Sequence, residues 1–179
     1  WGLDVDEDVI QWCQERISSR YSQFHFVHSP LHNKKYSPEA TVRAQDYRFP
    51  FDDTYFDLVY LVSVFSHMLP PDMEHYLGEI TRVLKPGGTC ISTFFLYDQL
   101  TQEHLDLGRP MMNFRYKGEN YLISNPDNPE SAIAYDKTFI EKIFSQNNLS
   151  VTQKLRLPAI PGMLMFLTEQ DILVATRVA

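Results

Sequence analysis

The sequence predicts an α/β fold with a doubly wound, mainly parallel sheet, helices on both faces and an antiparallel hairpin at the C-terminal end. Residues 56–62 form a continuously apolar run, which is typical of a strand buried on both faces of a parallel sheet. Residues 70–84 carry apolar side chains at helical spacing, and residues 89–96 form a second strand-like run. This alternation of strand and helix indicates an α/β sheet.

The segments before these elements continue the alternation. Residues 6–18 begin with acidic side chains and then repeat apolar ones every three or four positions, which predicts a helix packed on one face. Residues 24–28 are short and aromatic, as expected of a strand. Residues 29–43 contain two prolines and no periodicity, so they read as a long loop in which a helix of the alternation is missing.

The sequence after residue 97 predicts a lid and a closing hairpin. Residues 98–135 have no sustained period and are interpreted as a lid inserted over the substrate. Asp136 can cap a helix whose apolar face includes Ile140 and Ile143. The strand-like runs 149–157 and 171–178 can pair as an antiparallel hairpin that closes the sheet.

Bulk properties exclude several classes of protein. The 179 residues, 44% of them hydrophobic, predict one folded domain over residues 1–179. No apolar run is long enough to span a membrane, so we expect a cytoplasmic protein without membrane partners. The net charge of −7 and the lack of Lys and Arg clusters disfavour nucleic acid as substrate. Cys13 and Cys90 have no metal-ligand spacing and are expected to be reduced thiols, with no metal bound.

Three segments carry a family resemblance. They are Gly-Leu-Asp-Val-Asp at residues 2–6, Phe-Pro-Phe-Asp-Asp-Thr-Tyr-Phe-Asp-Leu-Val at 49–59 and Glu-Ile-Thr-Arg-Val-Leu-Lys-Pro-Gly-Gly at 79–88. In this order and spacing the chain resembles the class I, Rossmann-like S-adenosylmethionine-dependent methyltransferases, closely over residues 1 to 97 and more loosely to the terminal hairpin. The resemblance implies S-adenosylmethionine as cofactor and a small molecule as methyl acceptor.

The glycine-rich opening of that family is missing from the sequence. None of the glycines forms the Gly-x-Gly that lets a backbone approach a cofactor; they stand at positions 2, 78, 87, 88, 108, 118 and 162. In the family the first strand and its glycine turn come before the strand that ends at Asp4. We therefore expect either an N-terminally truncated chain or a sheet that lacks this strand, and weak cofactor binding by residues 1–179 alone.

Two acidic positions are the candidate nucleoside contacts. Asp4 ends a predicted strand, where a carboxylate can accept both hydroxyl hydrogens of a ribose; the resemblance implies this role for Asp4, with Val5 beside it. Asp46, followed by Tyr47, lies near the position where the family places an acid beside the adenine amino group. Counting back from the Phe-Pro-Phe segment brings Gln45 to that position instead, so both readings stay open.

The end of the buried strand supplies the other candidates. Val62 and Ser63 follow it at the carboxyl end, where open α/β sheets bind ligands, and we expect their backbone to contact the methionine part of the cofactor. Phe65 is expected in the core. His67 is the candidate catalytic base, because imidazole accepts a proton near neutral pH, although family members also carry a histidine here that the chemistry does not need.

Two other function classes remain open at this point. A catalytically inactive methyltransferase-like domain that binds a partner would explain the missing glycine loop. A nicotinamide-dependent dehydrogenase would share the ribose acid but would not explain the Leu-Lys-Pro-Gly-Gly segment. For a methyltransferase, the acceptor is expected beneath an aromatic-rich segment that contains Phe114, Tyr116, Tyr121 and Tyr135.

Overall fold

The computed structural model describes residues 1–34, 36–98, 114–155 and 170–178. The chain divides into two compact units, an N-terminal unit of Trp1–Arg48 and a C-terminal unit of Phe49–Ala179. The expected α/β architecture is present, with parallel strands in both units and an antiparallel pair at the end of the chain, but the sheet of the C-terminal unit is mixed rather than mainly parallel.

The N-terminal unit is built on a strand–helix–strand motif. Strand β1 (Gly2–Asp4) pairs in parallel with β2 (Phe26–His28), and parallel neighbours require a crossover such as the helix between them. That helix, α1 (Glu7–Cys13), continues into a π-helical turn, η1 (Gln14–Ser18). Asp6 caps α1 by accepting a hydrogen bond from the Val9 N–H. The predicted helix and both predicted strands are confirmed.

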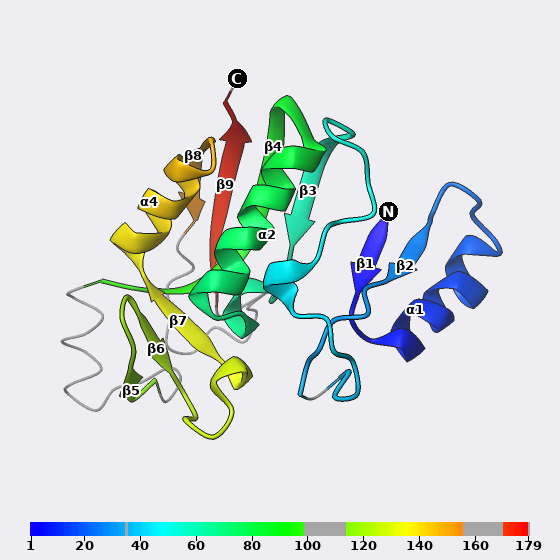
Figure 1. Ribbon diagram of the computed structural model, residues 1–179. Helices are drawn as coiled ribbons and strands as arrows, with labels where there is room; N and C mark the ends of the chain where they lie inside the picture. Colours follow the sequence, from blue (N-terminus) through cyan, green and yellow to red (C-terminus); the bar gives the residue numbers. More distant parts are fainter. Residues whose placement is uncertain (35, 99–113, 156–169, 179) are drawn as a thin grey trace, which may run out of the picture. The chain divides into compact units, whose positions relative to one another are not determined.

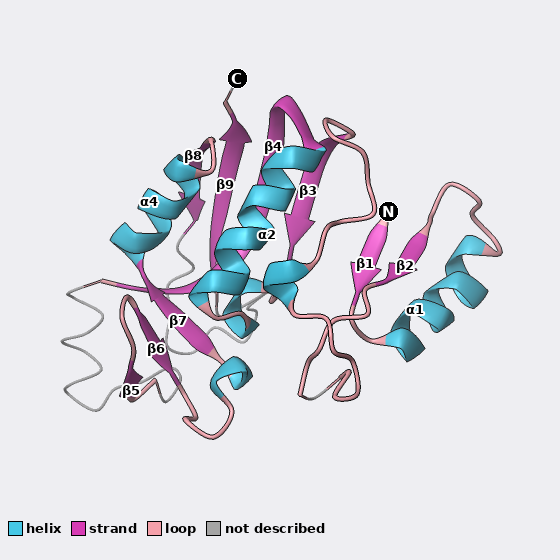
Figure 2. Ribbon diagram, in the orientation of Figure 1, coloured by secondary structure: helices cyan, strands magenta, loops and turns pink. Residues whose placement is uncertain are grey.

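The remainder of the N-terminal unit is mostly loop, as Figure 2 shows. An isolated bridge joins Leu31 to Val42, and a single 3-10 turn, η2 (Ala44–Asp46), precedes the end of the unit. The buried apolar side chains among the described residues of this unit are Ile10 and Leu31. The predicted long loop is therefore confirmed, and the unit encloses very little core.

The C-terminal unit holds a mixed sheet in which β4 is central. Strands β3 and β7 pair with β4 in parallel, whereas β9 pairs with it antiparallel and β8 then pairs antiparallel with β9. The expected closing hairpin is confirmed. The strands are β3 (Phe56–Leu61), β4 (Leu84–Tyr97), β5 (Tyr116–Lys117), β6 (Tyr121–Ile123), β7 (Ile133–Asp136), β8 (Leu149–Leu155) and β9 (Asp171–Arg177).

Two helices cover one face of this sheet (Figure 1). Helix α2 (Pro70–Val83) has proline in its first turn, where a missing N–H costs nothing. Helix α4 (Lys137–Gln146) is capped by Asp136, which accepts hydrogen bonds from the Thr138 and Phe139 N–H groups. Short 3-10 turns, η3 (Phe65–His67) and η4 (Pro129–Ser131), complete the helical elements described in this unit. Both predicted helices are confirmed, but the described helices of this unit cover one face of the sheet and not both faces as expected.

Aromatic packing under α2 and α4 forms the core. Phe94 of β4 is fully buried and stacks on Phe65, with ring centroids 5.0 Å apart. Its edges meet Tyr135 and Phe144 in T-shaped contacts. Since buried aromatic side chains supply large apolar areas, these four residues tie η3, β4, β7 and α4 together. The expectation that Phe65 belongs to the core is confirmed.

The expectation that strand 56–62 is buried on both faces is wrong. Alternate side chains of β3 are exposed: Leu58 by 50%, Tyr60 by 70% and, just after the strand, Val62 by 60%. Leu61, which points to the other face, is buried. Because α2 and α4 lie on one face of the sheet, the opposite face of β3 is uncovered within the described residues of its unit.

The second and third resemblance segments hold each other in place. Arg82 of α2 donates to the carbonyl oxygens of Phe49 and Phe51 and to the carboxylates of Asp53 and Glu79. Glu79 also accepts the Phe49 N–H at 2.7 Å. Burial opposes ionisation of Glu79, but Arg82 and this N–H outweigh it and lower its pKa. The residues that carry the family pattern here act as a structural clamp.

Glycine is required at positions 87 and 88 for two separate reasons. Gly87 has a φ of +78°, in the left-handed region that favours glycine. At Gly88 an added Cβ would lie 2.8 Å from the Lys85 carbonyl oxygen and 3.2 Å from that of Asp57, so a larger residue would collide with backbone. The turn lies inside β4, which begins at Leu84, earlier than the strand start expected at residue 89.

The predicted lid at residues 98–135 is only partly described. Residues 99–113 lie outside the described part of the chain. Residues 114–135 form β5, β6 and most of β7, an antiparallel extension that joins the sheet at the end of β4. A lid function, and the assignment of residues 1–179 to one domain, stay predictions.

Candidate functional site

Asp4 presents an exposed carboxylate at the carboxyl end of β1. Its Oδ1 accepts a hydrogen bond from the Asp6 N–H at 2.9 Å, which orients the side chain. Its Oδ2 makes no hydrogen bond among the described residues. Val5 follows, and its carbonyl oxygen lies 3.2 Å from Nε2 of His28 at the end of β2. The carboxylate is thus oriented through Oδ1, and Oδ2 is available to accept a hydrogen bond from a ligand.

Asp46 lies in the 3-10 turn η2 and is paired with an arginine. Its Oδ2 lies 3.0 Å from Nε of Arg43, and both side chains are more than half exposed. Exposed ion pairs of this kind contribute about 0–1 kcal/mol, so a ligand could replace the arginine at little cost. Tyr47 ends the turn by donating its N–H to the Ala44 carbonyl. Gln45 is half-buried.

Ser63 follows β3 in an unusual backbone conformation. Its φ of +56° lies in the left-handed region, which side-chain-bearing residues rarely adopt. Its N–H donates to Oγ1 of Thr93 on the neighbouring strand at 2.9 Å. Together with exposed Val62, this residue forms a sharp turn at the carboxyl end of the strand, where α/β folds bind ligands.

His67 lies at the end of the same turn, and its tautomer is defined by one contact. Its Nδ1 is 2.9 Å from the carbonyl oxygen of Glu130. Because a carbonyl oxygen can only accept, Nδ1 carries the hydrogen and a neutral imidazole presents Nε2 as an acceptor. The side chain is exposed. His67 is therefore oriented in a form that can accept a proton.

The candidate residues fall into two groups. Asp4, Val5, Asp46 and Tyr47 belong to the N-terminal unit, whereas Val62, Ser63 and His67 belong to the C-terminal unit. Within the C-terminal unit the structure brings Ser63 and His67 into one turn. The cofactor and catalytic roles of both groups stay predictions.

Sequence analysis missed three residues that shape this turn. They are Thr93, Glu130 and Gln170, which hydrogen-bond to Ser63 or His67 from distant parts of the chain. A polar pair at the start of the last strand-like run, Gln-Asp at 170–171, was the available signal. Tyr135 of the aromatic-rich segment is fully buried and donates its hydroxyl to the Met68 carbonyl, so it packs in the core.

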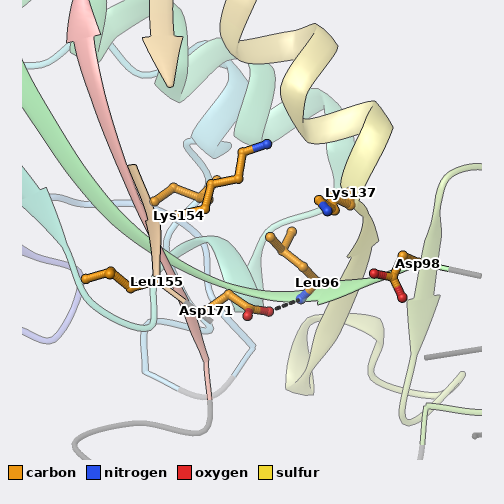
Figure 3. A pocket seen from close by; sticks show the side chains of 7 residues that line it. Leu96, Asp98, Lys137, Lys154, Leu155 and Asp171 are labelled. Atoms are coloured by element: carbon orange, nitrogen blue, oxygen red, sulfur yellow. Dashed lines mark hydrogen bonds between the residues drawn. The ribbon is translucent and has the colours of Figure 1, made fainter. Parts of the chain in front are cut away.

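A small cavity lies elsewhere in the C-terminal unit (Figure 3). It has a volume of about 70 Å³ and is lined by Leu96, Lys137, Lys154 and Asp171, among others. Asp171 accepts the Leu96 N–H at 3.3 Å on its wall. Sites for organic ligands usually measure about 300–1,000 Å³, so this cavity is too small to hold a nucleoside cofactor.

The described residues contain no group of three or more His, Cys, Asp or Glu side chains that could hold a metal ion. Nor does any helix in the described ranges have the length and apolar character needed to cross a membrane.

A family model described as a methyltransferase domain matches residues 1–92. This match covers half of the chain and includes all three resemblance segments. The chain belongs to the methyltransferase-domain family. The resemblance to class I S-adenosylmethionine-dependent methyltransferases is thereby confirmed.

Curated relatives match only parts of this chain. The tRNA N(3)-cytidine methyltransferase METTL2 of Gallus gallus is 31% identical over 113 residues, which are 63% of this chain and 27% of that protein. The sterol 24-C-methyltransferase erg6 of Schizosaccharomyces pombe is 36% identical over 72 residues, 40% of this chain and 18% of that protein. The matched part thus spans about a quarter or less of each relative's length.

Solved structures share the fold over nearly the whole chain. The PH0226 protein of Pyrococcus horikoshii OT3 has a TM-score of 0.62 and 19% identity, covering 98% of this chain and 70% of that one. The 1,6-didemethyltoxoflavin-N1-methyltransferase of Burkholderia thailandensis, solved with bound 1,6-didemethyltoxoflavin and S-adenosylhomocysteine, has a TM-score of 0.60 and 13% identity, covering 99% of this chain and 60% of that one. At these identities the likeness establishes the fold.

Proposed function

We propose that this methyltransferase-family protein transfers a methyl group from S-adenosylmethionine to a small organic acceptor. The observation that carries the proposal is the exposed, oriented carboxylate of Asp4 at the carboxyl end of β1. An acid at this place can accept hydroxyl hydrogens from a ribose, and it lies within the matched family region.

The residues fit a nucleoside cofactor on chemical grounds. Asp4 would hold the ribose through its available Oδ2, and Asp46 would accept from the adenine amino group in exchange for its exposed pair with Arg43. The backbone at Val62 and Ser63 would contact the methionine part. S-adenosylmethionine, when bound, supplies a methyl group already activated by a sulfonium centre, so no covalent enzyme intermediate is required.

His67 would act on the acceptor. With its hydrogen on Nδ1 and directed at Glu130, the imidazole can take the proton that an acceptor hydroxyl or amine loses as it is methylated. The rest of the chain's contribution is to orient the acceptor and to exclude water. Replacing His67 with Ala would slow methyl transfer by about 10²–10⁴-fold if this proton transfer is catalytic.

The choice of a small acceptor rests on charge. The net charge of −7 and the lack of a cationic cluster do not favour a phosphate backbone. The Burkholderia enzyme that shares the fold was solved with the small molecule 1,6-didemethyltoxoflavin bound, whereas METTL2 is named as a tRNA methyltransferase. The experiment must therefore distinguish a small-molecule acceptor from a tRNA acceptor.

The test is transfer of a tritiated methyl group from S-adenosylmethionine by the full-length protein. A metabolite extract of the source organism and bulk tRNA are offered separately, with His67→Ala as the matched variant. Label in low-molecular-weight products supports the proposal, and label in ribonuclease-sensitive material contradicts the small acceptor. No transfer together with tight S-adenosylhomocysteine binding would identify an inactive binding domain, and binding of a nicotinamide cofactor instead would identify a dehydrogenase.

A further inference from the structure

A buried polar cluster lies beneath the turn that follows β3. Gln170, directly before β9, is 5% exposed, Thr93 of β4 is 4% exposed, and Ser66 is completely buried. Ser63, in the turn itself, is the fourth member of the cluster. These four residues come from three segments that are far apart in sequence, and the amide of Gln170 forms hydrogen bonds with the other three.

The hydrogen bonds of this cluster use both ends of the Gln170 amide. Oε1 accepts from the hydroxyl of Thr93 and, at 3.3 Å, from that of Ser63. Nε2 donates to Oγ of Ser66 at 2.9 Å. Because the Thr93 hydroxyl gives its hydrogen to Gln170, its oxygen faces Ser63 as an acceptor and receives that residue's N–H. Gln170 thus orients the Thr93 hydroxyl that accepts the Ser63 N–H.

The Ser63 backbone needs such support. A φ of +56° at a serine is maintained only where the surroundings hold it, and strained positions of this kind concentrate at functional sites. The same cluster reaches Ser66, the residue directly before His67. One amide therefore supports both predicted functional parts of the turn, the backbone at Ser63 and the position of His67.

We infer that Gln170 is a positioning residue that holds the Ser63 turn in the shape required by the methionine part of the cofactor. It acts through Thr93, Ser63 and Ser66 and touches neither cofactor nor acceptor. The inference rests on the proposed function, because that function supplies the ligand. It predicts that loss of the Gln170 amide affects the methionine part of the cofactor and spares the nucleoside part.

The test compares two ligands that differ in that part. S-adenosylhomocysteine carries the amino acid, and 5′-methylthioadenosine has the same nucleoside without it. In Gln170→Met, which keeps the side-chain length and removes both polar atoms, calorimetric titration should show about tenfold weaker S-adenosylhomocysteine binding, equivalent to about 1.4 kcal/mol. Binding of 5′-methylthioadenosine should stay unchanged. Equal losses for both ligands, or no loss for either, would overturn the inference.

Two further variants keep the test decisive. Ser66→Ala removes the acceptor of the Nε2 hydrogen bond with little change in volume. It should weaken S-adenosylhomocysteine binding less than Gln170→Met does, and it takes the place of that variant if Gln170→Met folds poorly. Gln153→Met makes the same substitution at an exposed glutamine of β8 and should bind both ligands like the unmodified protein. A Ser66→Ala variant with unaltered ligand selectivity would also count against the inference.

Hydrogen exchange separates this inference from the proposed function. Without any ligand, Gln170→Met should accelerate amide exchange over residues 63–67 and leave β4 unaffected. Unchanged exchange in 63–67 would overturn the anchoring role even if the cofactor binds. If the unmodified protein binds neither ligand, the proposed function and the ligand part of the inference fail together, and the exchange result still decides whether Gln170 holds the turn.

Discussion

The two units of this methyltransferase-family chain carry similar numbers of candidate site residues on very different scaffolds. In the N-terminal unit, Asp4 ends a strand of a two-stranded parallel sheet and Asp46 lies in the turn η2, and the unit's buried apolar side chains are Ile10 and Leu31 among the residues described. In the C-terminal unit, Ser63 and His67 follow a strand of a larger sheet with an aromatic core. The predicted nucleoside contacts thus belong to the less supported region.

The difference shows how much a parallel pair depends on its surroundings. Parallel strands are normally buried on both faces, and an isolated pair of strands is at best marginally stable. The exposed Leu58 and Tyr60 of β3 show that one face of the sheet in the C-terminal unit also lacks cover among the described residues. We therefore expect the N-terminal unit to open locally well before the C-terminal unit unfolds.

The largest expected contrast is in thiol reactivity. Cys13 lies half-buried in α1, whereas Cys90 of β4 is fully buried and burial raises the pKa of its thiol to about 12. Cys13 should react with an aromatic disulfide reagent in native buffer. Cys90 should react only upon global unfolding, a process that costs about 5–15 kcal/mol in typical domains. Labelling is followed by absorbance, with Cys13→Ser as the control that leaves Cys90 alone. Equal rates for the two thiols would remove the contrast between the units.

A core truncation should show where the stability resides. Phe94→Ala removes the ring that contacts Phe65, Tyr135 and Phe144, and loss of a buried phenylalanine costs about 3–5 kcal/mol in the free energy of unfolding. Denaturant titration measures it. Phe24→Ala, at a ring that is 47% exposed, should change stability by less than about 0.5 kcal/mol. Similar losses for both would contradict the difference between the two units.

The clamp between α2 and residues 49–53 should make the C-terminal unit sensitive to acid. Because the folded state lowers the pKa of Glu79, its stabilisation is fully present above the unfolded value of about 4.3 and is lost as pH falls through the folded pKa. Glu79→Gln should cost about 1.5–3 kcal/mol at neutral pH and flatten the acid limb of a stability curve. Glu141→Gln, in an exposed pair with Lys154, should do neither. An unchanged acid limb in Glu79→Gln would refute the clamp's electrostatic role.

Much of the fold was predictable because its signals are local. The α2 periodicity, the Asp136 cap and the terminal hairpin depend on residues close in sequence, and all three are confirmed. Burial of β3 was predicted wrongly because apolar sequence does not reveal which neighbours cover a strand. The start of β4 was placed late because Gly87 and Gly88, which usually end elements, here make a turn inside a strand.

The candidate site was predictable only at its strand ends. Asp4 and Ser63 follow from the rule that ligands gather at the carboxyl ends of parallel strands. The hydrogen bonds that fix Ser63 and His67 come from Thr93, Glu130 and Gln170, far away in sequence. Such contacts depend on the tertiary fold, and a local signal such as the Gln-Asp pair at 170–171 does not reveal the partners.

Titration of S-adenosylhomocysteine tests the central claim most directly. The full-length protein should bind with one-to-one stoichiometry, and Asp4→Asn should bind about tenfold more weakly. Asparagine keeps the oxygen that accepts the Asp6 N–H but removes the charge and the second acceptor oxygen. Asp8→Asn, at an exposed acid of α1, is the matched control and should bind normally. Equal affinity of Asp4→Asn and the unmodified protein, or no binding by either, would contradict the account.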